Sequence, residues 1–434
     1  MRIFTVILVL LLSQICMAAT IHVPGDYTTI QEGINNASSG DTVLVADDTY
    51  TGDVNLGSLQ IYLISENGAA NTIIEGRISV GSSVYSEVNG FTARSILAEY
   101  GSTAYFKYCT IDALNNSGYG PACRIRGADI QFENCIFQNN YSSDSDGGAF
   151  FVTGRVLFDD CYFTNNYARL RGSCIFGHTG AKIFIYNTDF IDNHPPEVGA
   201  TYLHCISCDS IVMENCLGVG DIQFLSNEKI GIWDFSGYAS IKNCTFDGTK
   251  TPGWVPYLMS FIRGSSNPTI NIENCIFSHF SSFLNADEYG DEYINIDNCV
   301  LYDFDSLFSW SEPFAFSYYN TDPLYCDTTS DDYTISSTSF CDPANNPSGE
   351  LIGALPSGCK LDAICGDANS DDNVNVSDAV VIINFVFNSG SYMPAPLMAS
   401  DVNCDDRVNV SDAVYLISYV FSGGNVPCNG CQFE

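Results

Sequence analysis

Short runs of alternating apolar and polar residues, separated by Asn, Asp and Gly, recur through the first three quarters of the chain. The runs QFENCIF at 131–137 and LFDDCYF at 157–163 show the common pattern, which is apolar, polar, Asn or Asp, Cys, any residue, apolar. Such alternation predicts short β-strands joined by turns. Successive copies lie 24 to 31 residues apart. The repeated position is held by Cys109, Cys135, Cys161, Thr188, Cys216, Cys244, Cys275 and Cys299.

A repeat of this length, built from strands, predicts a solenoid with one coil per repeat, and a parallel β-helix fits it best. No long helical pattern occurs before residue 367. Because stacked coils are about 4.8 Å apart, the cysteines should form an internal column of small apolar side chains. Metal binding or redox activity of this column is the alternative to packing.

The residue before each cysteine predicts a second column, at a tight turn. Asn and Asp tolerate left-handed backbone, and stacked amides can hydrogen-bond from coil to coil. We interpret this column as structural. Its members are Asn134, Asp160, Asn187, Asn215, Asn243, Asn274 and Asn298.

The start of the chain and its composition predict an exported protein. Met1-Arg2, an apolar run at 3–12 and Ala18-Ala19 have the form of a secretory signal peptide, residues 1–19, and the run is too short to span a membrane. We therefore expect a secreted protein. The 434 residues favour more than one domain, and the net charge of −35 disfavours binding to nucleic acid or anionic membranes.

Export makes disulfides possible, and we expect them mainly among the cysteines near the C-terminus. Between residues 322 and 359 the coil pattern fades, and Pro, Ser, Asn and Asp become frequent. We expect residues 326–362 to form a closing coil and a linker, with Cys326 joined to Cys341.

The first residues after the signal peptide resemble a known family. The segments IHVPGDYTTIQEGI at 21–34 and GDTVLV at 40–45 are similar to the amino-terminal coil of bacterial right-handed parallel β-helix proteins of the pectate-lyase-like class. The resemblance covers residues 20–325. It implies an all-β solenoid whose open end is capped by a short amphipathic helix at 28–37.

Two matched acidic segments follow, DANSDDNVNVSD at 367–378 and DVNCDDRVNVSD at 401–412. Oxygen side chains at loop positions 1, 3, 5 and 12 and a backbone carbonyl at position 7 would converge on one hard cation, with position 9 acting through water. Each loop leads into an amphipathic helix, at 379–387 and 413–421. The expected ligands are Asp367, Asn369, Asp371, Asn373 and Asp378 in the first loop and Asp401, Asn403, Asp405, Arg407 and Asp412 in the second, where Asn373 and Arg407 contribute carbonyl oxygens.

The paired loops resemble the type I dockerin, a small all-α, calcium-dependent module that binds cohesin domains in cellulosome-like assemblies. The resemblance covers residues 363–428. It implies two structural Ca²⁺ ions and a cohesin-type partner on a scaffold protein. In that family the partner contacts cluster at loop positions 10 and 11, here Val376-Ser377 and Val410-Ser411. Their identity in the two repeats suggests that either face can dock.

The module departs from the dockerin pattern at loop position 6, where the chain turns sharply and Gly is usual. Asp372 and Asp406 stand there instead, which implies weaker calcium binding. Cys365 and Cys428 flank the module, and we expect a disulfide between them.

A second register in the central repeats suggests where a ligand would bind. It starts at GPAC (120), GGAF (147), GSCI (172) and GATY (199). In pectate-lyase-like proteins the substrate groove follows one sheet and the loops that lead into it, so residues of these strands that point outward are candidates. Arginines and aromatic rings suit an acidic or neutral glycan, and Arg or His could act as a base. The candidates are Arg124, Arg126, His178, Asp144, Asp146, Arg169 and Arg171, with Phe151, Phe176 and His194 beside them.

Two functions are consistent with this sequence. The first is a secreted carbohydrate-active or carbohydrate-binding β-helix subunit, attached through its dockerin to a cohesin-bearing scaffold and acting in polysaccharide breakdown. An enzyme of this kind would be a polysaccharide lyase or glycoside hydrolase acting on pectin-like polyuronates. The alternative is a non-catalytic surface or adhesive β-helix anchored by its dockerin. Ordinary solvated surface is the competing interpretation of the candidate residues, and the substrate class rests on fold analogy.

Overall fold

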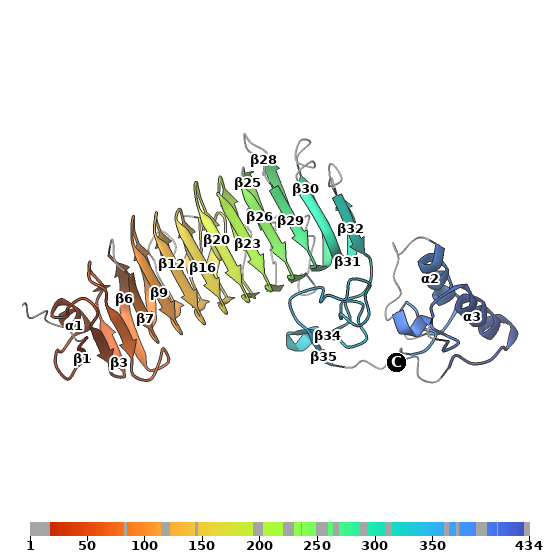
Figure 1. Cartoon of the computed structure of the whole chain (residues 1–434), viewed down its shortest axis with the longest axis horizontal. Helices are drawn as coiled ribbons and strands as arrows, with labels where there is room; N and C mark the ends of the chain where they lie inside the picture. Colours follow the sequence, from red (N-terminus) through yellow and green to blue (C-terminus); the bar gives the residue numbers. More distant parts are fainter. Residues whose placement is uncertain are drawn as a thin grey trace, which may run out of the picture.

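The chain forms a parallel β-solenoid followed by a small helical module, as the computed structural model shows (Figure 1). The solenoid and the all-α character of the C-terminal module were both predicted from the sequence and are confirmed. The structure describes residues 18–81, 85–113, 122–143, 146–193, 203–219, 230–235, 237–248, 259–263, 269–286, 294–308, 315–359, 364–369, 373–387, 397–405 and 407–428.

Strands of successive coils pair in parallel and build three sheets. The first sheet contains β1 (Thr20–Val23), β2 (Thr42–Val45), β5 (Tyr62–Ser65), β7 (Tyr85–Asn89), β9 (Thr103–Lys107), β12 (Asp129–Glu133), β16 (Arg155–Asp159), β20 (Lys182–Tyr186), β23 (Ser210–Glu214), β26 (Tyr238–Lys242), β29 (Thr269–Glu273), the start of β31 (Ile294–Phe308) and β32 (Ala315–Tyr319). The second contains β3 (Asp48–Thr51), the starts of β6 (Thr72–Val80), β8 (Thr92–Ala98) and β30 (Ile276–Ala286), β10 (Thr110–Asp112), β13 (Ile136–Gln138), β17 (Tyr162–Thr164), β21 (Asp189–Ile191), β24 (Leu217–Val219), β27 (Thr245–Asp247) and the middle of β31. The third contains β4 (Val54–Asn55), β11 (Cys123–Ile125), β15 (Phe150–Val152), β19 (Ile175–Gly177), β22 (Leu203–Ile206), β25 (Ile230–Phe235), β28 (Met259–Arg263) and the ends of β6, β8, β30 and β31.

The helix α1 (Ile30–Asn35) lies at the amino-terminal end of the solenoid (Figure 1). Its capping box satisfies backbone groups at its start, because the Thr29 hydroxyl accepts from the Glu32 N–H and the Glu32 carboxylate accepts from the Thr29 N–H. Ile30 and Ile34 are buried against the first coil. The amphipathic cap predicted at 28–37 is therefore present.

The predicted cysteine column is buried in the core, and all seven of its cysteines are free thiols. Each sulfur donates to the carbonyl of the residue two positions earlier, as Cys135 does to Glu133 at 3.3 Å. Thr188 keeps the same role, with its hydroxyl donating to the Tyr186 carbonyl at 2.7 Å. Within the described ranges no three His, Cys, Asp or Glu side chains gather closely enough to hold a metal ion. Packing accounts for the column.

The residues of the predicted turn column all adopt left-handed backbone, with φ between 48° and 56°. Their amides connect neighbouring coils: the Asn215 Nδ2 donates to the Asn187 Oδ1 at 3.0 Å, and the Asn298 Nδ2 donates to the Asn274 Oδ1 at 2.7 Å. The structural interpretation of this column is confirmed.

A further asparagine ladder, which the sequence analysis did not predict, lies inside the solenoid. Asn140, Asn166 and Asn193 are fully buried in three successive coils. The Asn166 Oδ1 accepts from the Asn140 Nδ2 at 2.8 Å, and the Asn166 Nδ2 donates to the Asn193 Oδ1 at 2.8 Å and to the Phe137 carbonyl at 2.8 Å. Every polar group of the Asn166 side chain therefore has a partner, as a buried amide requires.

We expect Asn166→Ala to destabilise the solenoid, because it removes the acceptor of the Asn140 backbone N–H and of one Asn140 Nδ2 hydrogen, and the side-chain donor to the Phe137 carbonyl. Buried unsatisfied groups of this kind cost about 1–3 kcal/mol each. Thermal melting of the variant should show a clear fall in Tm. The control is Gln131→Ala, a half-buried position on the first sheet, which should melt close to the wild type. Equal melting of the two variants would contradict the role of the ladder.

Residues 320–359 do not add a coil but cover the outer face of the second sheet. They contain β33 (Tyr325–Asp327), the 3₁₀ helix η2 (Thr328–Ser330), β34 (Asp332–Ser336) and β35 (Ser357–Cys359), which form a separate small sheet. Ile335, Phe340 and Ile352 pack on Ile276 and Val300. This segment is named the closing segment below. It corrects the expectation of a closing coil.

Gly353 sets the closing segment against the sheet. Its N–H donates to the Asn274 carbonyl at 2.8 Å, and its φ is +100°. A Cβ here would lie 2.5 Å from the Cδ1 of Ile276, so both the backbone conformation and the close approach require glycine.

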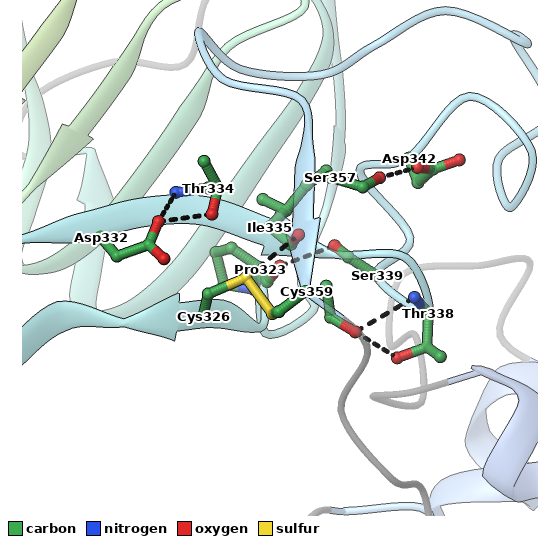
Figure 2. The surroundings of a disulfide bond; sticks show 11 residues. Pro323, Cys326, Asp332, Thr334, Ile335, Thr338, Ser339, Asp342, Ser357 and Cys359 are labelled. Atoms are coloured by element: carbon green, nitrogen blue, oxygen red, sulfur yellow. Dashed lines mark hydrogen bonds between the residues drawn. A yellow bond between two sulfur atoms is a disulfide. The ribbon is translucent and has the colours of Figure 1, made fainter.

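The disulfide of the closing segment joins Cys326 to Cys359, as Figure 2 shows. The predicted partner, Cys341, is instead a buried free thiol. The predicted pairing was wrong because Cys341 packs inward with Phe340 and Ile352, whereas Cys359 on β35 lies beside the β33–β34 pair. Around the bond the Ser339 hydroxyl donates to the Pro323 carbonyl at 2.6 Å, and the Thr338 N–H donates to the Ser336 hydroxyl at 3.2 Å (Figure 2).

The C-terminal module consists of α2 (Val376–Phe387), η3 (Leu397–Ser400) and α3 (Val410–Ser422). Both helices begin three residues before their predicted starts, because they include loop positions 10 to 12. Its core contains Ala379, Ile382, Val402, Ala413 and Leu416. No helix among the described residues is long and apolar enough to cross a membrane.

Candidate functional site

The third sheet places several predicted candidates in one row. Arg124 of β11 pairs with Phe151 of β15, Phe151 pairs with Phe176 of β19, and Phe176 pairs with His204 of β22. The inward neighbours Cys123 and Ile125 are buried, while Arg124 is only half-buried. Alternation along each strand therefore turns this row away from the core, as the second register predicted.

The row becomes more buried along the solenoid axis. Phe151 is half-buried, but Phe176 is 1% exposed and His204 is 0% exposed. The Phe176 ring lies 5.7 Å from the Phe151 ring and 5.8 Å from the His204 ring, centroid to centroid. Burial and the nearby charge of Arg171 lower the pKa of His204 to about 3, so its imidazole is neutral at neutral pH. The expectation that Phe176 lies on the surface is corrected.

Two stacked loops flank this row. They contain β14 (Tyr141–Ser142) and β18 (Tyr167–Ala168), which pair in parallel. The Tyr141 and Tyr167 rings stack with centroids 4.8 Å apart, and Tyr141 is 47% exposed. The buried Asn140–Asn166–Asn193 ladder lies at the base of these loops and holds them in register.

Arg171 and Asp146 form an ion pair between these loops. The Arg171 Nε lies 2.9 Å from the Asp146 Oδ1, and its Nη2 lies 3.2 Å from the Oδ2. The guanidinium also lies 5.2 Å from the centre of the Phe176 ring. Because Asp146 balances its charge and Phe176 covers one face, Arg171 supports the row from the side.

The remaining candidates lie at the edges of this surface or outside the described residues. Arg126 lies 3.9 Å from Glu99 on the preceding coil, and both side chains are exposed. His178 is exposed, with its ring 6.3 Å from that of Phe151. Arg169 is exposed on the loop that carries Arg171. Asp144 and His194 lie outside the described residues.

The structure thus joins Arg124, Phe151, Phe176, His178 and Arg171 into one surface, which is named the Arg–Phe surface below. Its accessible part offers a cation, an aromatic ring and an imidazole on three successive coils, with Phe151 between Arg124 and His178. Such a surface can hold a carboxylate and stack against a sugar ring. Its role as a site stays a prediction.

The two acidic loops have matching internal geometry. In each, the carboxylate at position 12 is fully buried and ties the loop together: Asp378 accepts from the N–H groups of Asn369 and Asn375 at 3.1 and 2.8 Å. Asp412 accepts from those of Asn403 and Asn409 at 3.3 and 2.9 Å. The position 1 carboxylates of Asp367 and Asp401 are also buried.

The expected ligands in the described part of these loops present carboxylate, amide and carbonyl oxygens, and such oxygens suit a hard cation. Burial, with the charges of Asp401 and Asp405 nearby, raises the pKa of Asp412, so the carboxylates of the second loop repel one another. A calcium ion would be held here by the position 1 and position 12 carboxylates, and it would offset that repulsion. Asp371, Asp372 and Asp406 lie outside the described residues.

Position 9 also has a structural part that was not predicted. The Asn409 Oδ1 accepts from the Ser411 N–H at 2.9 Å and so caps α3, while its Nδ2 donates to the Arg407 carbonyl at 3.2 Å. Asn375 makes the equivalent contacts to Ser377 and Asn373. These asparagines therefore cap the helices and orient the position 7 carbonyls.

Residues 365–421 match the family model described as the Dockerin type I domain. The C-terminal module is a type I dockerin domain. Domains of this type are known to bind calcium, and dockerins generally bind cohesins.

The dockerin is closed by a disulfide between Cys404 and Cys428. The predicted Cys365–Cys428 pairing was wrong, because the chain after α3 returns to the second loop, where the Cys428 N–H donates to the Val402 carbonyl. Cys365 is also disulfide-bonded.

Residues 85–254 match the family model of the right-handed β-helix region, so the solenoid that carries the dockerin is a right-handed β-helix. No curated protein sequence matches the chain. Among solved structures, a mannuronic acid specific polysaccharide family 6 lyase from human gut microbiota is 13% identical over 67% of this chain and 82% of its own, with a TM-score of 0.37. A pectin methylesterase is 12% identical over 55% and 80%, with a TM-score of 0.30. These values give no information on activity.

Two features next to the Arg–Phe surface of the solenoid were not predicted from the sequence. The Tyr141–Tyr167 stack and the Asn140–Asn166–Asn193 ladder are both visible in the sequence as QNNY at 138–141, TNNY at 164–167 and IDNH at 191–194. The first residue of each Asn-Asn or Asp-Asn pair has left-handed backbone, with φ of 54°, 52° and 52°. This turn directs the second residue of the pair inward.

Proposed function

We propose that this protein is an exported carbohydrate-active or carbohydrate-binding subunit that docks through its dockerin onto a cohesin-bearing scaffold. The dockerin match at residues 365–421 is the observation that carries this proposal. A docking module joined to a β-helix fits a cargo of a cellulosome-like assembly. The predicted signal peptide, residues 1–19, supports export, and N-terminal sequencing of the secreted protein after Ala18 or Ala19 would test it.

Calcium is proposed to have a structural role in the dockerin, with one ion in each loop. The matched hydrogen bonds of Asp378 and Asp412 support two equivalent sites. When bound, the ion would supply positive charge to a cluster of buried carboxylates. The chain's own residues then hold the two helices in the orientation that a partner recognises.

The docking faces proposed for the dockerin are the solvent-exposed stripes of its two helices. Val380 and Phe387 on α2 are 50% and 67% exposed, and their equivalents Val414 and Phe421 on α3 are 60% and 68% exposed. Val376 and Val410, at loop position 10, continue these stripes. Apolar side chains exposed at helical spacing are typical of helix faces that bind a partner. The two stripes are equivalent, so either could dock.

The Arg–Phe surface is proposed as the glycan contact. Arginine is scarce in this chain, with only 16 Lys and Arg against 51 Asp and Glu. The concentration of Arg124, Arg126, Arg169 and Arg171 around three coils of the third sheet therefore stands out from an acidic protein. The carboxylates of a polyuronate would complement this local positive charge, and a sugar ring could stack on Phe151. As an enzyme, the protein would be a lyase or hydrolase for pectin-like polyuronates.

We expect Arg124→Ala and Phe151→Ala each to weaken retention on pectins or alginates by at least about 10-fold, since each removes a contact worth about 1.5 kcal/mol. Affinity electrophoresis on embedded glycans measures the retention. The matched control is Arg94→Ala, an exposed arginine paired with Glu75 elsewhere on the solenoid. Wild-type protein that neither cleaves nor binds any polyuronate would count against the glycan role.

The alternative function is a non-catalytic surface or adhesive β-helix anchored by its dockerin. The burial of His204 and the charge balance of Arg171 favour it over catalysis, because both leave fewer reactive groups in reach of a substrate. Cleavage of a polyuronate that is lost in Arg124→Ala or Arg126→Ala would exclude this alternative. Glycan retention without cleavage would support it.

A further inference from the structure

Two cysteines outside the cysteine column share one space inside the third sheet. Cys205 is the third residue of β22, which ends at Ile206, and Cys208 follows across a turn in which Ser207 has left-handed backbone, with φ of 55°. Both side chains are buried, at 0% and 1% exposure, and both are free thiols. Both sulfur atoms lie against Gly177 of the neighbouring coil.

Gly177 makes room for both sulfur atoms. It pairs with Cys205 in the neighbouring coil, between Val152 and Cys205 in an inward-facing stack. A Cβ at this position would lie 2.7 Å from the Cys208 Sγ and 2.8 Å from the Cys205 Sγ. The two sulfurs therefore occupy the volume that a side chain of residue 177 would fill, and they are separated by no more than the sum of these two distances.

These thiols differ from those of the column in how they are held. Each column sulfur donates to the carbonyl two residues earlier, which fixes its direction. No such donation to a carbonyl is found for Cys205 or Cys208 among the described residues, and their two sulfur atoms share the space beside Gly177. The turn between them keeps both on the same side of the coil.

We propose that Cys205 and Cys208 are joined by a disulfide in the oxidised protein. The reaction is thiol–disulfide exchange with a disulfide oxidant, either a small-molecule disulfide or a disulfide oxidoreductase. One thiolate attacks the oxidant and forms a mixed disulfide, and the second thiolate displaces the oxidant's remaining sulfur. The two cysteines lose two electrons and two protons, and the oxidant is reduced to two thiols. Because both sulfurs are buried in the folded coil, exchange takes place before the coil closes.

The bond would lock the turn that follows His204 at the end of β22. Burial that protects the thiols from oxidants also protects the disulfide from reductants, so reduction should require unfolding. Glycine at residue 177 leaves the space in which the two sulfur atoms can approach each other.

The test is peptide mapping of protein secreted through an oxidising compartment. The protein is denatured without reductant in the presence of iodoacetamide, digested and analysed by mass spectrometry. We expect the peptide that carries Cys205 and Cys208 to be unalkylated and two hydrogen masses lighter than the dithiol form. Peptides that carry Cys135 and Cys161 should be alkylated. The Cys326–Cys359 and Cys404–Cys428 bonds serve as internal evidence of oxidation.

Alkylation of both cysteines in a preparation that contains those two bonds would overturn the proposal, and so would a link from either cysteine to another peptide. A second measurement uses Cys208→Ser, in which Cys205 should become alkylated and the Tm should fall. Dithiothreitol should reduce the wild-type bond only when denaturant is added. These readouts are independent of glycan or cohesin binding, so the proposal can fail while the proposed function stands.

Discussion

Removal of calcium from the full-length protein is expected to unfold residues 363–428 and to leave the β-helix intact. Asp378 and Asp412 are fully buried, and Asp412 lies close enough to Asp401 and Asp405 for their charges to raise its pKa. Without a cation these carboxylates repel one another in a module whose apolar core is small. Circular dichroism should show loss of the signal of α2 and α3, while the strand signal persists.

Limited proteolysis in EGTA or in excess calcium shows which part of the chain unfolds when calcium is removed. Cleavage should be confined to the dockerin in EGTA and suppressed when calcium is restored. The Asp378→Ala and Asp412→Ala double variant should be cleaved under both conditions, and Glu66→Ala, at an exposed position of the solenoid, should behave as the wild type. An unchanged dichroism spectrum and cleavage pattern in EGTA would show that the loops do not depend on calcium.

Simultaneous substitution of both dockerin helices is expected to abolish cohesin binding, although either substitution alone leaves most of it. Val380→Asp places a charge in the centre of the exposed α2 stripe, and Val414→Asp does the same on α3. If either face can dock, one intact face maintains the affinity. Loss of both should weaken binding at least about 100-fold, the effect of removing a central apolar contact of an interface.

Isothermal titration against a cohesin that captures the wild type distinguishes the possible outcomes. The four proteins compared are the wild type, Val380→Asp, Val414→Asp and the double variant. A large loss from Val380→Asp alone, with none from Val414→Asp, would show that only α2 docks. Normal binding by the double variant would exclude the helix stripes. Failure of every cohesin tested to bind the wild type in calcium would remove the support for scaffold attachment. Because both positions are exposed, the variants should keep the wild-type melting curve of the dockerin.

The sequence predicted those features that depend on local geometry repeated from coil to coil. The Asn134 to Asn298 column was predictable because a left-handed turn restricts the residue type, and the cysteine column was predictable from its fixed place after that turn. The alternation of Arg124, Phe151 and Phe176 with buried neighbours gave their register correctly. Neither periodicity nor spacing shows what packs over an outward-facing residue. For this reason the burial of Phe176 and His204 was not foreseen.

The disulfide pairings could not be predicted from the sequence. Two cysteines can pair only when their Cα atoms approach within about 4.4–6.8 Å, and spacing along an irregular chain does not fix that distance. The Cα atoms of Cys326 and Cys359 are 5.9 Å apart because β33 and β35 both lie against β34. The predicted pairing of Cys365 with Cys428 in the dockerin was wrong for the same reason. Irregular segments place their residues through tertiary contacts, which have no period in the sequence.

The Cys326–Cys359 bond has a mechanical consequence for a protein that is tethered at one end. The chain leaves the solenoid near Cys326 and continues towards the dockerin after Cys359. Tension applied to the dockerin therefore passes from Cys359 to Cys326 through the sulfur–sulfur bond, and the chain between them carries no load. The 33-residue separation would otherwise release about 110 Å of slack under force. With the bond in place, the tether keeps a fixed length, and the strands of the last coils receive the pull directly.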